Sequence, residues 1–283
     1  MPAAINLLGP CTRYLPGAVI EFAARAAAAS ALALSLLGAE AGLGAQADAA
    51  DIRLLSAAAM QSVLKETVAD FERSSGHKLI ITYDTIGGIE KRQRNGEAYD
   101  IVIGSSLIMP ALSREGRIDS RSLLELCRTA IGGVVPIGTP APSFASVDAF
   151  KRAMLDAKFI IYADPVRGGA AGVHIARQIE KLGIAEQLKS KTRVAAGGDV
   201  TEVTLALGDG ALGMTQVSEI VQKKGAMFVG LLPDELQNYT VFVAGAPAQP
   251  SEAVVAFSSF LQSPRVRDVI RAKGMQPGPD RDD

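Results

Sequence analysis

The chain contains no tryptophan and few of the residues that build reactive or cross-linked sites. It has two cysteines and two histidines among 283 residues, and neither a G-x-S-x-G, a Walker nor a zinc motif occurs. Its 29 basic and 30 acidic residues leave a net charge of −1, so no nucleic-acid or membrane-surface partner is indicated. We therefore expect no metal, no cofactor and no catalytic triad.

The N-terminal segment has the pattern of a secretory signal. Arg13 and Arg25 precede an apolar run of Ala, Leu and Ser over residues 26–38, and the small residues 45–47 follow. The run is shorter than the roughly 20 residues that span a bilayer as a helix. We predict that residues 1–47 form a signal peptide that is cleaved after Ala47, which would place the mature protein in the periplasm.

Cleavage at that position would leave Cys127 as the only thiol. An intramolecular disulfide is then excluded. Cys127 ends the apolar stretch 123–127, so we expect a buried small side chain and not a nucleophile.

From residue 51 onward, short apolar runs alternate with amphipathic stretches, a pattern typical of βαβ units around a mostly parallel sheet. The expected strands cover residues 52–56, 78–83, 100–104, 159–162, 192–195, 212–215 and 227–232. The expected helices cover residues 58–74, 86–95, 107–114, 147–157, 172–182, 200–207, 217–223, 251–262 and 264–272.

Two further extended stretches, residues 123–137 and 239–244, suggest that the chain crosses between two lobes. We predict an α/β protein with lobe 1 formed by residues 48–130 and 239–283 and lobe 2 by residues 131–238. The crossings would form a hinge, with the ligand cleft between the lobes.

The turns between strands and following helices carry small or Gly-rich sequences. Ligands of open α/β sheets bind beyond the carboxyl ends of the strands, where these turns lie. Helix N-termini there present unpaired N–H groups that bind anions. The turns in question are residues 56–59, 85–88, 165–172, 196–200 and 215–218.

Four short stretches resemble the type 2 periplasmic solute-binding proteins in their order and spacing: residues 55–60, 96–103, 163–165 and 212–219. The resemblance is closest to the molybdate-binding branch and spans roughly residues 51 to 277. It implies a two-lobed clamp, expected to be monomeric, that passes a small anion to a membrane ABC permease without catalysis.

The resemblance also implies a set of ligand-binding positions. Molybdate-binding members place serine hydroxyls where this sequence has Ala59 and Ile86, and a tyrosine where it has Gln216. These departures argue against molybdate, and Arg167 in its Gly-rich turn favours a carboxylate, which a guanidinium binds with two parallel hydrogen bonds. The candidate residues are Ser56, Ala58, Ala59, Thr85, Ile86, Gly87, Arg167, Gly168, Gly169, Ala171, Gly198, Val200, Thr201 and Gln216.

An enzyme on the same scaffold is the alternative. An isomerase such as aconitate isomerase, which interconverts cis- and trans-aconitate by proton transfer, needs an anion clamp and a base. Arg167 would be the clamp, and His174 the first candidate base. Asp84, Asp199 and Glu202 are the other candidates.

Two more features have simpler explanations. His77 lies in a helix-to-strand turn, where we expect a surface residue. Lys91, Arg92 and Arg94 lie with Glu90 on one expected helix, most simply as a solvated face, with Arg92 near enough to its start to lean toward the cleft.

Overall fold

The computed structural model describes residues 49–221 and 223–279. The predicted signal peptide lies outside these residues, so its prediction stands untested. Within the described ranges, every helix is too short or too polar to cross a membrane.

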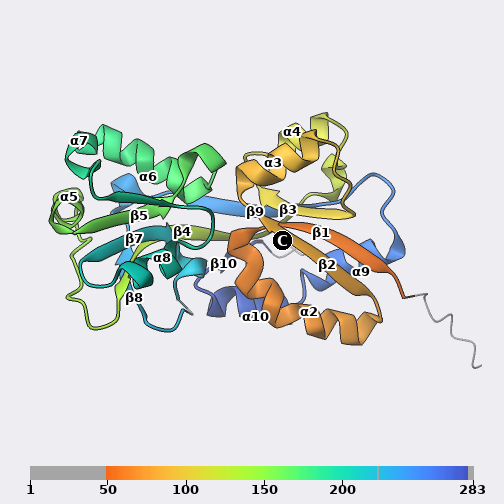
Figure 1. The fold of residues 1–283 in the computed structure, drawn as a ribbon. Helices are drawn as coiled ribbons and strands as arrows, with labels where there is room; N and C mark the ends of the chain where they lie inside the picture. The colour runs from red at the N-terminus through yellow and green to blue at the C-terminus, as the bar shows by residue number, and fades with distance from the viewer. Residues whose placement is uncertain (1–48, 222, 280–283) are drawn as a thin grey trace, which may run out of the picture. The chain divides into compact units, whose positions relative to one another are not determined.

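The strands and helices alternate along most of the chain, as Figure 1 shows. The strands are β1 (Asp51–Ala57), β2 (Lys78–Asp84), β3 (Ile101–Ser105), β4 (Leu124–Pro136), β5 (Phe159–Ala163), β6 (Thr192–Ala195), β7 (Ala211–Gln216), β8 (Ala226–Leu231), β9 (Tyr239–Gly245) and β10 (Gln276–Pro277). The helices are α2 (Gln61–Ser75), α3 (Ile86–Arg94), α4 (Met109–Arg114), α5 (Val147–Asp156), α6 (Ala170–Lys181), α7 (Ala185–Leu188), α8 (Val200–Leu207), α9 (Glu252–Phe260) and α10 (Pro264–Ala272). Short 3-10 turns add η2 (Ala58–Met60), η3 (Ser120–Ser122), η4 (Pro165–Arg167), η5 (Val217–Glu219) and η6 (Asp234–Leu236).

The main path of the sheet runs in the order β2-β1-β3-β9-β4-β7-β5-β6. β1 pairs in parallel with β2 and β3, and β5 with β6 and β7. β9 is antiparallel to β3 and β4, and β4 is antiparallel to β7, β8 and β10. The expectation of a mostly parallel sheet was therefore wrong at its centre. The strands that cross between the lobes run against their neighbours, because the chain leaves one lobe and returns to it.

Strand β4 belongs to both lobes. Its residues 124–130 pair with β9, whereas residues 131–136 pair with β7 and β8. One hydrophobic core draws on β1, β3 and β9 with α2, α9 and α10, and a second on β5 and β7 with α5 and α6. We call the part around the first core lobe 1 and the part around the second, which includes α8, lobe 2.

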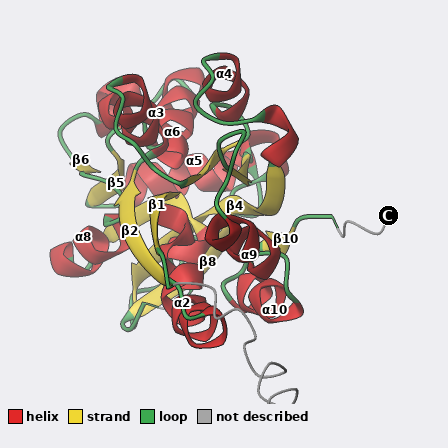
Figure 2. Cartoon of the chain, turned by 90° about the vertical axis from the view of Figure 1, so that its right-hand side faces the viewer, coloured by secondary structure: helices red, strands yellow, loops and turns green. Residues whose placement is uncertain are grey.

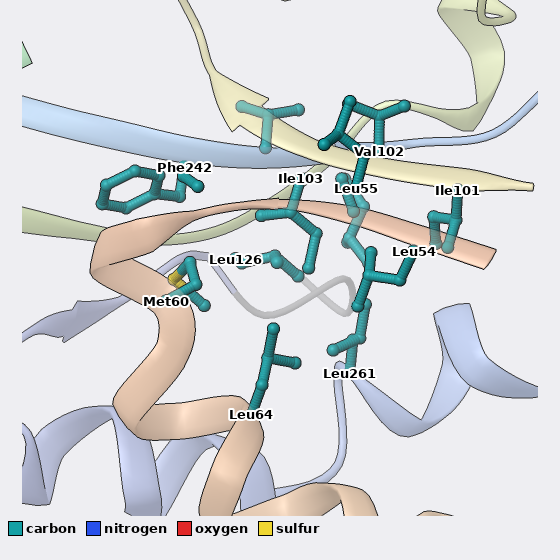
Figure 3. Close-up of a cluster of buried hydrophobic side chains, with 14 of the residues drawn as sticks. Leu54, Leu55, Met60, Leu64, Ile101, Val102, Ile103, Leu126, Phe242 and Leu261 are labelled. Atoms are coloured by element: carbon teal, nitrogen blue, oxygen red, sulfur yellow. The ribbon is translucent and has the colours of Figure 1, made fainter. Parts of the chain in front are cut away.

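The lobe 1 core is built from apolar strands covered on both faces. Figures 1 and 2 show α3 and α4 on one side of β1 and β3, and α2 and α10 on the other. Figure 3 shows Leu54, Ile103 and Phe242 from the strands meeting Met60 and Leu64 from the segment that begins α2. Burial on both faces explains why these strands are continuous apolar runs without alternation. The rigid sheet fixes where each strand-to-helix turn emerges.

Local predictions mostly agree with the structure, with two corrections. The helix expected over residues 217–223 is only the single turn η5, because Val217 and Ser218 are buried and no amphipathic helical face develops. His77 is 5% exposed and not a surface residue, since its Nδ1 accepts a hydrogen bond from the Ala50 N–H at 3.3 Å. Cys127 is fully buried as predicted, and burial raises the pKa of its thiol.

Candidate functional site

A cleft runs between the lobes at the carboxyl ends of the strands. Its outer part, which we call the outer cleft, has a volume of about 700 Å³. A smaller space of about 40 Å³, which we call the inner pocket, adjoins it. The residues that line both are Ala58, Ala59, Asp84, Thr85, Gly197, Gly198 and Glu219. The two spaces therefore share a wall, and a ligand in one lies against residues of the other.

The two lobes touch where the turn that begins at Thr85 faces the turn at Arg167 and Gly168. The Thr85 hydroxyl donates to the Arg167 carbonyl at 2.6 Å, and the Gly87 N–H donates to the Gly168 carbonyl at 3.2 Å. A Cβ placed on Gly87 would lie 2.9 Å from the Cα of Gly168. This close approach requires glycine at both positions, because a Cβ on either one would clash with the other. Since the two turns are in contact, the lobes are in a closed arrangement.

Helix starts surround the inner pocket, and most of them have no side-chain cap. Thr85 caps α3, accepting from the Gly88 N–H at 3.0 Å. By contrast, η2, which leads into α2, and helices α6 and α8 begin without a side-chain hydrogen bond at the cap. The first N–H groups of a helix have no partner within it. Three helix starts therefore leave donors and partial positive charge for an anion.

Most charged side chains of the outer cleft are already paired. Asp84 accepts from Arg92 at 2.7 Å, Glu66 accepts from Lys273 at 2.5 Å, and Glu202 accepts from Lys223. Arg92, which we expected to lean toward the cleft, pairs with Asp84. It lines a separate space that Gly87 and Gly168 also line.

Two cations of the outer cleft differ from these. Within residues 49–221 and 223–279, neither the Lys65 ammonium nor the Arg167 guanidinium has a hydrogen-bond or ion-pair partner. Lys65 comes from lobe 1 and Arg167 from lobe 2, and both side chains are exposed. The outer cleft therefore offers unpaired positive charge from both sides.

Glu219 provides a titratable carboxyl at the shared wall. The Thr215 hydroxyl donates to its Oε2, and the Thr201 hydroxyl donates to its backbone carbonyl at 2.9 Å. Burial raises the pKa of Glu219 to about 7, and the negative charge of Glu202 adds to this, whereas the hydrogen bond from Thr215 opposes it. A carboxyl with a pKa near neutrality can accept or release a proton at working pH.

The structure brings all the predicted Gly- and Ala-rich turns together at the inner pocket. Arg167 lies in the outer cleft, and Gly87 and Gly168 form the lobe contact. The predicted residues that line the inner pocket are Ala58, Ala59, Thr85, Ile86, Gly169, Ala171, Gly198 and Gln216.

Four other predicted residues lie outside the lining of both spaces. Ser56 and Thr201 are fully buried, and their hydroxyls donate to the carbonyls of Ala57 and Glu219. Val200 has a buried side chain at the start of α8. His174 has its Nε2 2.7 Å from the Leu236 carbonyl oxygen and lines neither space.

Sequence reasoning missed Glu219 and Lys65. The one local signal for Glu219 is its position four residues after Thr215, just past the end of β7, where cleft residues are expected. Lys65 gives no signal, because an exposed lysine one turn into a helix is ordinary. In the described part of the chain, no three His, Cys, Asp or Glu side chains are grouped so as to hold a metal ion.

Comparisons with known proteins agree with this architecture. A family model described as bacterial extracellular solute-binding protein matches residues 52–276. An aconitate isomerase from a Pseudomonas species is 28% identical over 236 residues, covering 81% of this chain and 88% of that protein. The molybdate-binding protein ModA of Azotobacter vinelandii is 26% identical over 243 residues, covering 82% and 92%.

The fold is likewise that of solved anion-binding proteins. The sulfate-binding protein SubI from Mycobacterium tuberculosis H37Rv superposes with a TM-score of 0.64 at 15% identity, covering 81% of this chain and 87% of that one. The match of the family model over most of the chain, together with the two lobes and the cleft, shows that this protein belongs to the bacterial extracellular solute-binding proteins.

Proposed function

We propose that this protein binds a small organic anion with two or more carboxylate groups in the cleft and delivers it to a membrane ABC permease. The observation that carries the proposal is the combination of three uncapped helix starts at the inner pocket with two unpaired cations in the outer cleft. Donors in both the inner pocket and the outer cleft suit an anion with a charged group at each end.

The chemistry of the donors favours carboxylates. The inner pocket offers backbone N–H groups beside small side chains, which let an oxygen approach the helix starts closely. Arg167 can hold a second carboxylate with two parallel hydrogen bonds, and Lys65 adds a point charge. Ala59 and Ile86 supply no hydroxyl, and the Gln216 amide already donates to Thr240 at 3.0 Å. These positions offer little to a compact inorganic oxyanion.

The relatives support the transport role and the class of ligand. ModA and SubI are named for molybdate and sulfate, both small anions. We extend to this chain the partner and location typical of the family: an ABC permease, and a periplasmic monomer exported by residues 1–47.

Ligand-dependent melting tests the proposal. We expect succinate, fumarate or trans-aconitate to raise the melting temperature of the cleaved protein, since ligand at 100 times the Kd adds about 2.7 kcal/mol. Succinamide, which has the same backbone without charge, is the matched control and should have no effect. Molybdate and sulfate belong in the same plate. If no anion shifts melting at millimolar concentration, the binding function is excluded.

An isomerase is a second candidate, favoured by one specific observation. Glu219 places a carboxyl with a pKa of about 7 at the wall shared by the inner pocket and outer cleft. It can remove a proton from a carbon next to a carboxylate held by Arg167 and return it at the other end of the allylic system. The similarity to aconitate isomerase supports this chemistry.

Solvent exchange tests the enzyme. The protein is incubated with trans-aconitate in D2O, and proton NMR follows both the appearance of cis-aconitate and the loss of the exchangeable C–H signal. Turnover that disappears in Glu219→Gln supports the isomerase. Absence of both isomerisation and exchange excludes this reaction and leaves binding alone.

A further inference from the structure

Glu219 lines both the inner pocket and the outer cleft, the two spaces in which we place the anion. Thr215 donates to Oε2, while Oε1 lies beside Gly198, so that a Cβ on that glycine would be 3.0 Å from the oxygen. Gly198 stands at the uncapped start of α8, one of the helix starts that offers donors to an anion. A carboxyl and an anion site are therefore adjacent.

We propose that Glu219 is protonated when the anion is bound and donates its O–H to the anion, so that binding takes up one proton. This inference rests on the proposed anion-binding function and adds a specificity-determining residue to it. Glu219 would then favour ligands that present a free acceptor oxygen at the inner pocket.

The physical basis is repulsion between like charges in a desolvated space. Two carboxylates a few ångströms apart do not both stay ionised where water is excluded, so one takes up a proton. The anion is held by helix starts and cations and stays ionised. Glu219 forms no ion pair with any residue in the described ranges. Hydrogen bonds from the Thr215 hydroxyl and the Gln216 N–H and the charge of Lys223 favour its ionised form, but burial outweighs them. Burial already holds its pKa near 7, and a neighbouring anion raises it further.

The charged groups around Glu219 are consistent with this assignment. On its own side of the cleft they are Asp199 and Glu202 of the α8 region, Lys223 and Arg167. Across the cleft they are Lys65, Glu66, Asp84 and Lys273. Lys223 and Lys273 are each committed to a glutamate, and Asp84 to Arg92. Lys65 and Arg167 have no such partner, and a bound anion neutralises these two, which leaves Lys223 as the cation that still favours an ionised Glu219.

Isothermal titration calorimetry between pH 6 and pH 8.5 tests the proposal. The probes are sulfate and fumarate, which stay fully ionised over this range, and trans-aconitate, whose own titration is measured separately. We expect the Kd to be about tenfold higher at pH 8 than at pH 6, because above the pKa only the protonated fraction of Glu219 binds. Titrations at pH 8 in two buffers of different ionisation enthalpy should show uptake of nearly one proton per anion.

Two variants sharpen the result. Glu219→Gln keeps an acceptor for Thr215 and cannot titrate, so its Kd should be independent of pH and close to the wild-type value at pH 6. Glu202→Gln removes a charge that raises the pKa of Glu219. Its affinity should still fall with pH, from a lower midpoint.

The possible failures can be told apart. Binding with the same Kd at all pH values and no proton uptake overturns the role of Glu219 and leaves the binding function intact. If none of the three probes binds at any pH, the anion-binding function fails and the inference falls with it.

Discussion

The two walls of the cleft differ in how many of their polar groups already form hydrogen bonds or ion pairs within the protein. On the lobe 1 wall, Thr85 caps α3, and Asp84 and Lys273 hold partners of the same lobe. On the lobe 2 wall, α6 and α8 begin uncapped, Arg167 lies unpaired, and Glu219 has a raised pKa. Lobe 2 therefore carries most of the open donors.

This difference separates two tasks within one site. Lobe 1 contributes η2, whose start is uncapped, and Lys65, but the carboxylates Asp84 and Glu66 of its wall are already paired with cations of the same lobe. Lobe 2 keeps a carboxyl that burial makes costly to ionise and a cation without a protein partner, and both favour a ligand that pairs with them. The following changes test the comparison.

The largest effect is expected from Glu219→Gln on stability. A carboxyl whose pKa is raised from 4.5 to about 7 destabilises the folded protein as pH rises between these values, and fully above pH 7. Glu219→Gln should therefore increase the free energy of unfolding by about 3 kcal/mol at pH 8 and by little below pH 4.5. Urea denaturation at the two pH values measures this.

The exposed Glu186→Gln is the control and should change stability by less than about 0.5 kcal/mol at either pH. A Glu219→Gln protein that is less stable than wild type at pH 8 would show that the carboxylate is solvated or paired. Ionising Glu219 would then not destabilise the folded protein.

The two unpaired cations should contribute unequally to binding. Arg167→Ala is expected to weaken binding of a dicarboxylate at least tenfold, about 1.4 kcal/mol, because the planar guanidinium makes two hydrogen bonds. Lys65→Ala should cost threefold or less, since an exposed ammonium is a hydrated point charge. Calorimetric Kd values at pH 6 decide this, and Arg167→Lys separates charge from geometry. Equal losses for Arg167 and Lys65 would remove the distinction between the walls.

The smallest effect concerns the cap on the lobe 1 wall. Thr85→Ala removes the cap of α3 and the bond to the Arg167 carbonyl, so stability should fall by about 1 kcal/mol and ligand affinity by about fivefold. Ser146→Ala removes the equivalent cap of α5, which accepts from the Ala149 N–H at 3.2 Å and touches no other lobe. It should cost the same stability and leave the Kd unchanged. A loss of affinity in both variants would point to general destabilisation.

Much of the fold could be predicted because each element is specified locally. Neighbouring residues are enough to predict the apolar runs that form β1 and β3. They also predict the end of α2 at Gly76, which has a φ of 77°. The antiparallel pairing of β8 and β9 could not be predicted, because it depends on how the chain returns between the lobes. The same holds for His77, which is buried by contacts with Ala50 and the ring of Phe71.

The site was predictable as a location more than as a set of side chains. Turns at the carboxyl ends of strands must gather at one edge of the sheet, and they do at the inner pocket. Which polar groups stay unpaired depends on contacts distant in sequence. Glu219 acquires its raised pKa from burial and from the charge of Glu202, and Thr201, a predicted ligand donor, instead donates to the Glu219 backbone carbonyl.

The facing glycines, Gly87 and Gly168, have a consequence for how the clamp can be tuned. Because backbone meets backbone there, a side chain at either position would hold the two turns farther apart. A series of increasingly large side chains at position 87 would act as spacers of known size. The Kd values of ligands of different size could then be compared across variants that differ only in the distance between the lobes.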